Sequence, residues 1–196
     1  MKRKSFDMVA SGAALLVATV LLAASGLLFW AQSFVSDSVR TQLVAQKVFF
    51  PKAGSESLNN PEVKPFLSQY AGQQLVNGQQ AKAYADHFIA VHLKAIGGGK
   101  TYSELSAQAQ ATPTDTVLQQ KVATVFRGET LRGLLLNAYA FGTMARVAFV
   151  AFWIALGSGL ALVLLSVLGL LHARRTSYEV DVHVPGWHPE QLPAAR

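Results

Sequence analysis

Two long hydrophobic runs without charge constrain this chain more than any other feature. No acidic or basic side chain occurs from Met8 to Ser36, and none occurs from Val147 to Leu171. A helix of about 20 apolar residues, rising about 1.5 Å per residue, crosses the ~30 Å hydrocarbon core of a bilayer. Each run is therefore predicted to be a transmembrane helix, which would place the protein in a membrane.

Basic residues flanking the two runs predict the orientation of the chain. Three lie within the first four positions, and Arg174 and Arg175 follow the second run. Such residues gather on the cytoplasmic side of spans, although Arg132 and Arg146 on the other side weaken the bias. The expected segments are a cytoplasmic N-terminus at 1–7, transmembrane helix 1 at 8–32, an extracytoplasmic domain at 33–146, transmembrane helix 2 at 147–171 and a cytoplasmic tail at 172–196.

The first run also shares features with a cleaved signal peptide. It follows a basic start and contains small residues from Ala23 to Gly26, as at a cleavage site. Its apolar stretch from Met8 to Trp30 is longer than the roughly 7–15 residues of a signal-peptide core. We therefore favour an uncleaved signal anchor, with cleavage as the alternative.

Charge and cysteine content exclude several classes of function. The net charge is +6, but between residues 33 and 146 eleven Lys/Arg and seven Asp/Glu are scattered without a run. A basic patch is the minimal footprint of nucleic-acid binding, so nucleic acid is not an expected partner. The chain has no cysteine, which excludes disulfides and thiolate metal sites.

The segment between the spans is predicted to be helical throughout. Apolar spacing after Trp30 extends the first span's helix to about Phe50, where Pro51 follows. Four further helices are expected. One starts at Asn60-Pro61-Glu62, a second covers about Gln73 to Ile96, and a third runs from Thr101 to about Ala111. The last starts at Thr112–Asp115 and enters the second span, with a bend near Gly128. The predicted fold is all-α, with two transmembrane helices extended into an extracytoplasmic helical bundle.

Two patterns are similar to a metal site and a nucleotide site but are better explained otherwise. His87 and His92 are five residues apart, so their rings diverge by about 140° on a helix, whereas a two-histidine zinc site needs a spacing of four. Gly97–Gly99 precede a lysine but follow a helix rather than a strand, so they indicate a helix stop. No catalytic residue, metal or cofactor is predicted, and we do not expect an enzyme.

A polar cluster precedes the second span and is the candidate contact for a partner or lipid. It consists of Arg127, Glu129, Arg132 and Arg146. Glu129 and Arg132 are three residues apart and can pair on one helix face. Two interpretations remain open: an interfacial salt bridge with an arginine reaching the headgroups, or the docking of a partner subunit or a lipid phosphate.

Small residues recur every four positions within both runs and are the candidates for packing of the spans. They are Ala10, Ala14 and Ala18 in the first run, and Ala151, Ala155 and Gly159 in the second. Small side chains allow helices to approach closely in lipid, although alanine is also common in any apolar span. Neither run has a charged residue in its middle, so no ion path is predicted.

Two stretches carry a resemblance, Tyr70–Glu104 and Phe126–Phe141. They resemble a group of actinobacterial two-span membrane proteins with a helical extracytoplasmic domain, and the resemblance covers roughly Arg40 to Arg146. The resemblance implies residence in the bacterial plasma membrane, but it implies no activity and no catalytic residue. The layout is also similar to the sensor half of bacterial chemoreceptors, although the 25 residues after Leu171 are too few for their output domain.

These features predict a non-enzymatic accessory or scaffold subunit of a plasma-membrane protein assembly. Its partners would be the lipid bilayer and other membrane-protein subunits, or further copies of itself. The alternative is a membrane-anchored sensor or a module that binds a small molecule or lipid, with a cavity lined by Tyr84, Phe88 and His92. Alternating residues at 178–184 could add a strand to a partner's sheet, or the tail could be disordered.

Overall fold

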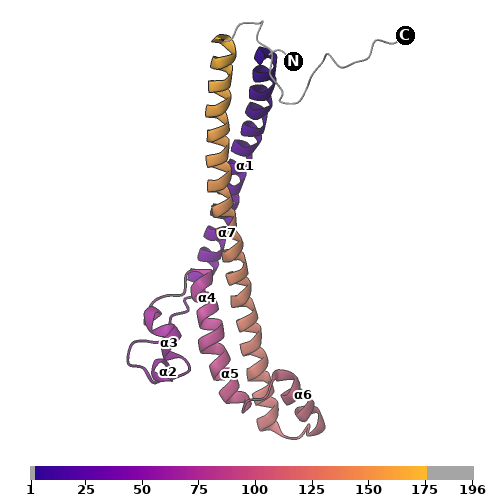
Figure 1. Cartoon of the computed structure of the whole chain (residues 1–196). Coiled ribbons are helices and arrows are strands. Elements are labelled where there is room, and N and C mark those ends of the chain that lie inside the picture. Colours follow the sequence, from indigo (N-terminus) through magenta and orange to yellow (C-terminus); the bar gives the residue numbers. More distant parts are fainter. Residues whose placement is uncertain (1–2, 176–196) are drawn as a thin grey trace, which may run out of the picture. The chain divides into compact units, whose positions relative to one another are not determined.

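The computed structural model describes residues 3–175, and all regular structure within that range is helical. In chain order (Figure 1) the elements are α1 (Arg3–Ala45), α2 (Glu56–Asn59), α3 (Lys64–Leu67), the 3-10 helix η1 (Ser68–Tyr70), α4 (Gly78–Tyr84), the π-helical segment η2 (Ala85–Ile89), α5 (Ala90–Gly97), α6 (Tyr102–Ala111) and α7 (Thr116–Arg175). The predicted all-α class is confirmed for this part of the chain. The segment 178–184, with its predicted strand-like alternation, lies outside the described residues.

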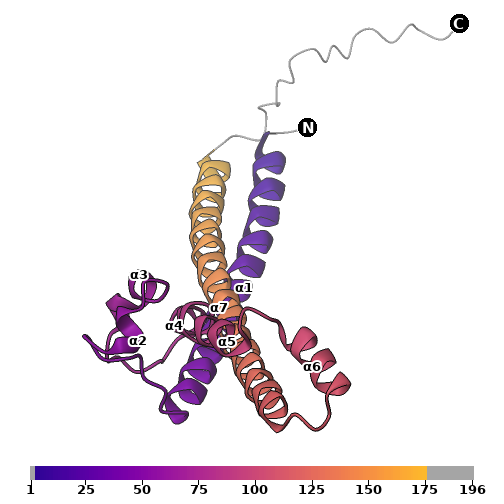
Figure 2. The ribbon, with the colours of Figure 1, turned by 90° about the horizontal axis from the view of Figure 1, so that it is seen from below.

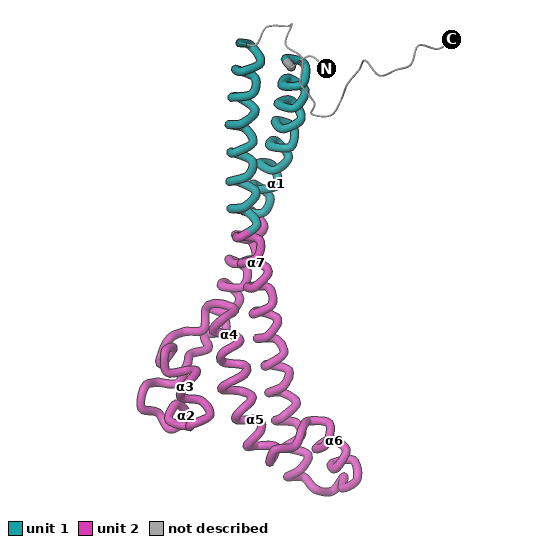
Figure 3. The backbone as a smooth tube through the Cα atoms, viewed as in Figure 1, with its two compact units in different colours: residues 1–28, 151–196 teal, residues 29–150 magenta. Residues whose placement is uncertain are grey.

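The chain divides into two compact units, and α1 and α7 each contribute a part to both (Figure 3). Unit 1 consists of residues 1–28 and 151–196, and unit 2 of residues 29–150. The dividing points at 28/29 and 150/151 lie close to the predicted segment borders at 32/33 and 146/147.

In unit 1, α1 and α7 pack through a seam of small residues. Ser11, Ala18 and Ser25 are buried at intervals of seven on α1. A Cβ built on Gly159 would lie 3.4 Å from the Ala18 carbonyl oxygen, and one built on Gly169 would meet the Ser11 hydroxyl. Seven residues nearly complete two helical turns, so residues spaced by seven stay on the face toward the partner helix. Residues spaced by four move around the helix axis by about 40° per step.

The seam includes only part of the predicted four-residue stripes. On α1 Ala18 is fully buried, Ala14 is half-buried and Ala10 is exposed. On α7 Ala155 and Gly159 are buried and Ala151 is half-buried. The seam of α1 therefore follows Ser11 and Ser25, two hydroxyl residues that the prediction omitted.

The outward faces of both helices in unit 1 are strongly apolar. Leu16, Leu27 and Leu165 are between 61% and 69% exposed. In each helix, only 11% of the most apolar window of 18 residues is buried, which is unlike the core helix of a water-soluble domain. By length and composition, α1 and α7 are each able to cross a membrane.

Unit 2 contains one hydrophobic core, built by the end of α1, the segment after it, the α4–α5 rod and α7. Its buried members include Leu43, Phe50, Leu58, Val63, Leu67, Leu75 and Leu135. Within this unit, α2 and α3 lie on one side of the α4–α5 rod and α6 on the other (Figure 2).

The helix predicted at 73–96 starts later than expected and contains a π-helical turn. It starts at Gly78, because backbone bonds from Phe50 to Gln73 (2.9 Å) and from Leu75 to Val48 (2.9 Å) hold the preceding segment extended. Asn77 then caps the helix by accepting from the Gln80 backbone N–H at 3.0 Å.

A π-helical turn in the middle of the α4–α5 rod keeps the buried residues of the rod on one face. Ala81, Ala85, Ile89, Leu93 and Gly97 are buried at intervals of four. In an α-helix that interval drifts by about 40° per step, so five such positions would wind around the rod. The wider turn of η2 counteracts the drift and keeps these residues toward the core.

Two further predicted boundaries are wrong, each because a long-range or local polar contact decides the conformation. The first helix ends at Ala45 rather than Phe50, because Lys47 is left-handed (φ +52°) and the chain then runs beside residues 73–75. The Asn60-Pro61-Glu62 segment is a turn, with the Asn60 side chain accepting from the Glu62 N–H at 2.8 Å, and α3 starts at Lys64.

The boundaries with strong local capping are confirmed. Thr101 and Glu104 form the capping box of α6, and Gly98 stops α5 in a left-handed conformation. Asp115 caps α7 through the Leu118 N–H at 2.9 Å, and α7 continues without interruption to Arg175. The helix is continuous through Gly128, near which a bend was predicted, and Gly128 leaves room for the Leu93 side chain.

Candidate functional site

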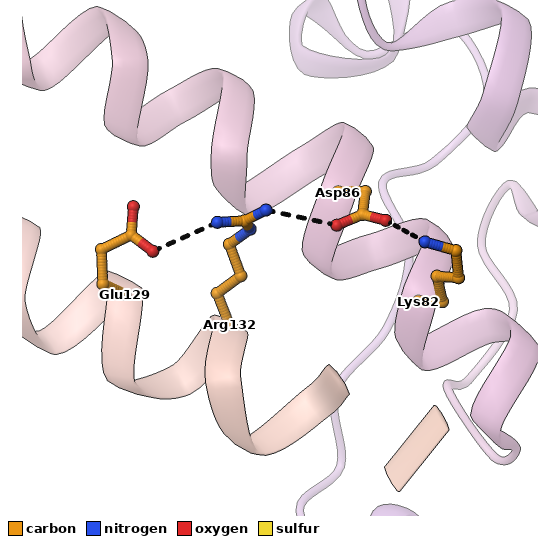
Figure 4. A network of polar contacts seen from close by, with 4 residues as sticks. All are labelled: Lys82, Asp86, Glu129 and Arg132. Carbon is orange, nitrogen blue, oxygen red and sulfur yellow. Dashed lines mark hydrogen bonds and ion pairs between the residues drawn. The ribbon is translucent and has the colours of Figure 1, made fainter. Parts of the chain in front are cut away.

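A chain of four charged side chains connects the α4–η2 rod to α7 (Figure 4). Lys82 contacts Asp86 at 2.5 Å, Asp86 contacts Arg132 at 3.5 Å, and Arg132 contacts Glu129 at 3.3 Å. The Glu129–Arg132 pair was predicted from its spacing. Asp86 was missed, because its contact with Arg132 depends on the packing of two helices that are distant in sequence.

The protonation of this network favours a structural role. Burial raises the pKa of Asp86, but the hydrogen bond and charge of Lys82 and the charge of Arg132 outweigh it, so the pKa lies below its ordinary value. The hydrogen bond to Asp86 raises the pKa of Lys82 above its ordinary value. Both groups therefore stay charged near neutral pH, whereas a general acid or base works best with a pKa near the operating pH.

The four residues of the predicted contact cluster do not form one site. Arg127 is exposed on α7, and Glu129 and Arg132 belong to the network with Asp86. Arg146 lies 14 residues after Arg132 on the same helix, which corresponds to about 21 Å.

The residues of the predicted cavity stack on one another. The ring centroids of Tyr84 and Phe88 are 4.7 Å apart, those of Phe88 and His92 are 4.3 Å apart, and Phe50 meets Tyr84 edge-on. None of the three predicted residues lines either of the grooves described below. The three side chains that the sensor hypothesis placed around a ligand therefore contact one another.

The two histidines on the rod have separate surroundings. His87 stacks on Phe66 with centroids 3.6 Å apart. The Nδ1 atom of His92 lies 2.7 Å from the Phe88 carbonyl oxygen, and since a carbonyl only accepts, this nitrogen carries the proton. Within residues 3–175 no group of three or more His, Cys, Asp or Glu side chains is placed to hold a metal ion.

An apolar groove of about 480 Å³ lies between α1 and α7 in unit 2. Phe34, Leu134 and Phe141 line it and are all more than half exposed. Val39, Leu43, Leu135 and Ala138 form further parts of its wall.

A second, polar cleft of about 390 Å³ lies in the same unit and shares Val39 with the groove. Its charged lining consists of Asp37, Arg40 and Arg146. Asn77, Gln79, Gln80 and Tyr70 supply further polar groups. Arg146 was predicted as a contact residue and Arg40 was not, because the two arginines line the same cleft only after α1 and α7 pack.

Two glycines create this cleft by bringing backbones into contact. A Cβ built on Gly78 would lie 2.8 Å from the Ala138 carbonyl oxygen and 3.4 Å from the Gly142 Cα. The start of α4 therefore rests directly on α7, which places Gln79 beside Arg146. With the Gln79 amide oriented so that its oxygen faces α7, that oxygen accepts from Arg146 Nη2 at 3.1 Å and from Nη1 at 3.3 Å.

Comparison of the chain with protein-family models, with curated proteins and with solved structures finds no match. The case for a function therefore depends on the geometry of the two units.

Proposed function

We propose that this chain is a non-enzymatic accessory or scaffold subunit of a protein assembly in a bacterial plasma membrane. In this proposal the unit 1 helices span the membrane, residues 33–146 form an extracytoplasmic helical bundle, and both termini are cytoplasmic. The observation that carries it is the apolar outward surface of unit 1, because only 11% of each helix's most apolar window is buried within the chain itself. Such a surface needs lipid or a partner to cover it.

The packing of unit 2 supports a bracing role over a catalytic one. The aromatic rings along the rod contact one another, and the half-buried Asp86–Arg132 contact ties the rod to α7. The resemblance to actinobacterial two-span proteins supports the bacterial plasma membrane as the location.

The second candidate is a membrane-anchored module that binds a lipid or small molecule. The observation that favours it is the pair of clefts in unit 2, with volumes of about 480 and 390 Å³. These clefts differ from the cavity that the sequence predicted, because Tyr84, Phe88 and His92 do not line them.

Crosslinking in native membranes, followed by purification, distinguishes the two candidates. A scaffold is expected to retain a membrane protein in fixed stoichiometry, and a bulky Leu165→Trp substitution on the exposed face is expected to reduce that yield. The control is Val117→Trp, which changes an apolar residue at the other end of α7 that is 71% exposed, against 61% for Leu165. A chain that purifies alone and carries one small molecule per copy would contradict the scaffold proposal.

A further inference from the structure

The polar cleft of unit 2 has the composition of an anion site. The cationic side chains that line it, Arg40 and Arg146, outnumber its one acidic side chain, Asp37. Neither arginine forms an ion pair within residues 3–175, whereas Arg132 on the same helix as Arg146 forms two. The two guanidinium groups therefore lack a counter-ion inside the described protein.

The groups already in the cleft leave these donors available. Arg146 contacts the neutral amide oxygen of Gln79, whereas an anionic group would also neutralise the guanidinium charge and can accept two parallel N–H bonds from it. The side-chain amide of Gln80 already has partners, because its Oε1 accepts from the Val76 N–H at 2.8 Å and its Nε2 donates to the Gln73 side chain. Asn77 is occupied as the cap of α4. Of the charged side chains in the cleft, the two arginines are thus the ones able to bind an anion.

Phosphate matches these donors better than a carboxylate does. Each guanidinium presents a planar fork of N–H groups that can bind two oxygens, and a phosphate group offers enough oxygens for two forks. The cleft holds about 390 Å³, which is larger than a phosphate group and leaves room for the atoms esterified to it.

The geometry points to a phosphate-binding site in which Arg40 and Arg146 hold a phosphate ester. Both arginines are the first basic residues beyond the uncharged runs, Arg40 after Ser36 and Arg146 immediately before Val147. If the runs span the membrane as proposed above, lipid headgroups are one source of this chemistry, so this part of the inference rests on the proposed function. A soluble phosphate ester is the other source.

Native mass spectrometry of the full chain, released from detergent micelles, tests the site. The probes are dihexanoyl phosphatidylglycerol, dihexanoyl phosphatidylcholine, glycerol phosphate and inorganic phosphate. We expect the variant Arg40→Gln/Arg146→Gln to bind the preferred phosphate probe about tenfold more weakly than the unmodified chain. The control is Arg127→Gln, which removes one positive charge, where the double variant removes two, from an exposed position on α7 outside the cleft and should leave binding unchanged.

A third variant has the opposite expected effect. Asp37→Asn removes the one carboxylate of the cleft and should strengthen phosphate binding severalfold, a gain that misfolding does not explain. Equal binding by all variants, or equal losses in Arg127→Gln and the double variant, would overturn the site.

The four probes identify the source of the phosphate. Binding of phosphatidylglycerol alone assigns the site to an anionic lipid, and equal competition by glycerol phosphate assigns it to a soluble ester; both support the site. Binding of both lipids with no dependence on the arginines would show attachment through acyl chains and overturn it. Because the soluble probes need no membrane, this result is independent of whether the spanning proposal holds.

Discussion

At the scale of single residues, Gly78 determines how closely α4 approaches α7. The nearest atoms to a Cβ at this position belong to the backbone of Ala138 and Tyr139, at 2.8 and 3.0 Å, so they cannot move aside like a side-chain end. We expect Gly78→Ala to destabilise the protein by about 1–3 kcal/mol, the usual cost of overpacking. Thermal unfolding of the full chain in detergent, followed by circular dichroism, measures this.

The matched control for that prediction is Gly133→Ala on α7. Nothing lies within 4 Å of a Cβ at Gly133, and alanine favours a helix over glycine by about 1 kcal/mol. This control should therefore leave the melting temperature unchanged or raise it. A melting temperature for Gly78→Ala as high as that of Gly133→Ala would mean that α4 does not rest on α7 as described.

Asp86 makes the stability of unit 2 dependent on pH. Its pKa is lowered in the folded protein, so its contribution is present above its unfolded pKa of about 3.9 and is lost as the pH falls through the folded value. We expect Asp86→Asn to cost about 1 kcal/mol at neutral pH, since its partners are partly exposed to solvent. Unfolding curves at pH 7 and below pH 4 should show this difference shrinking with acid.

The control for the pH prediction is Glu62→Gln, which breaks an exposed pair with Lys94. Those two side chains are 59% and 66% exposed, so their pair should contribute close to nothing. If Asp86→Asn behaved like this control at every pH, the Asp86–Arg132 contact would have no energetic role.

At the scale of elements, the seam between α1 and α7 in unit 1 makes a prediction about register. A Cβ on Gly169 would lie 3.6 Å from the Ser11 Cβ, within the range of about 3.5–4.5 Å that a disulfide needs. The double variant Ser11→Cys/Gly169→Cys should therefore form an intramolecular disulfide in oxidised membranes. Because the chain has no cysteine, the shift in gel mobility is read without background.

The control for the register is Ser11→Cys/Gly157→Cys. No atom outside the neighbouring backbone lies within 4 Å of a Cβ at Gly157, so this pair should stay reduced. Equal disulfide yields in the two variants would contradict the seven-residue seam.

The same elements show which features of a sequence predict structure locally. The capping box at Thr101–Glu104 and the stop at Gly98 depend on residues within a few positions, and both were predicted correctly. The start of α4 and the end of α1 depend on bonds between residues 48–50 and 73–75, which no local pattern reveals. For the same reason, the pairing of Asp86 with Arg132 and the placement of Arg40 and Arg146 in one cleft were not predicted.

At the scale of the whole molecule, the proposed topology predicts opposite labelling of two positions. Single cysteines replacing Ser68, which is exposed in unit 2, and Thr176, which follows α7, would lie on opposite sides of the membrane. A membrane-impermeant maleimide applied to intact cells should label Ser68→Cys, and it should label Thr176→Cys only after permeabilisation. The cysteine-free parent chain is the control. Labelling of Thr176→Cys in intact cells would contradict cytoplasmic termini.

The wide turn of η2 has a consequence for how such chains diverge in evolution. This turn contains the five residues Ala85–Ile89 and keeps buried residues that are four positions apart on one face of the rod. A descendant that lost one residue there would regain ordinary helical winding, with its inward positions then separated by threes and fours. A one-residue gap between positions 85 and 89 would thus be the signature by which diverged orthologues of this chain are aligned.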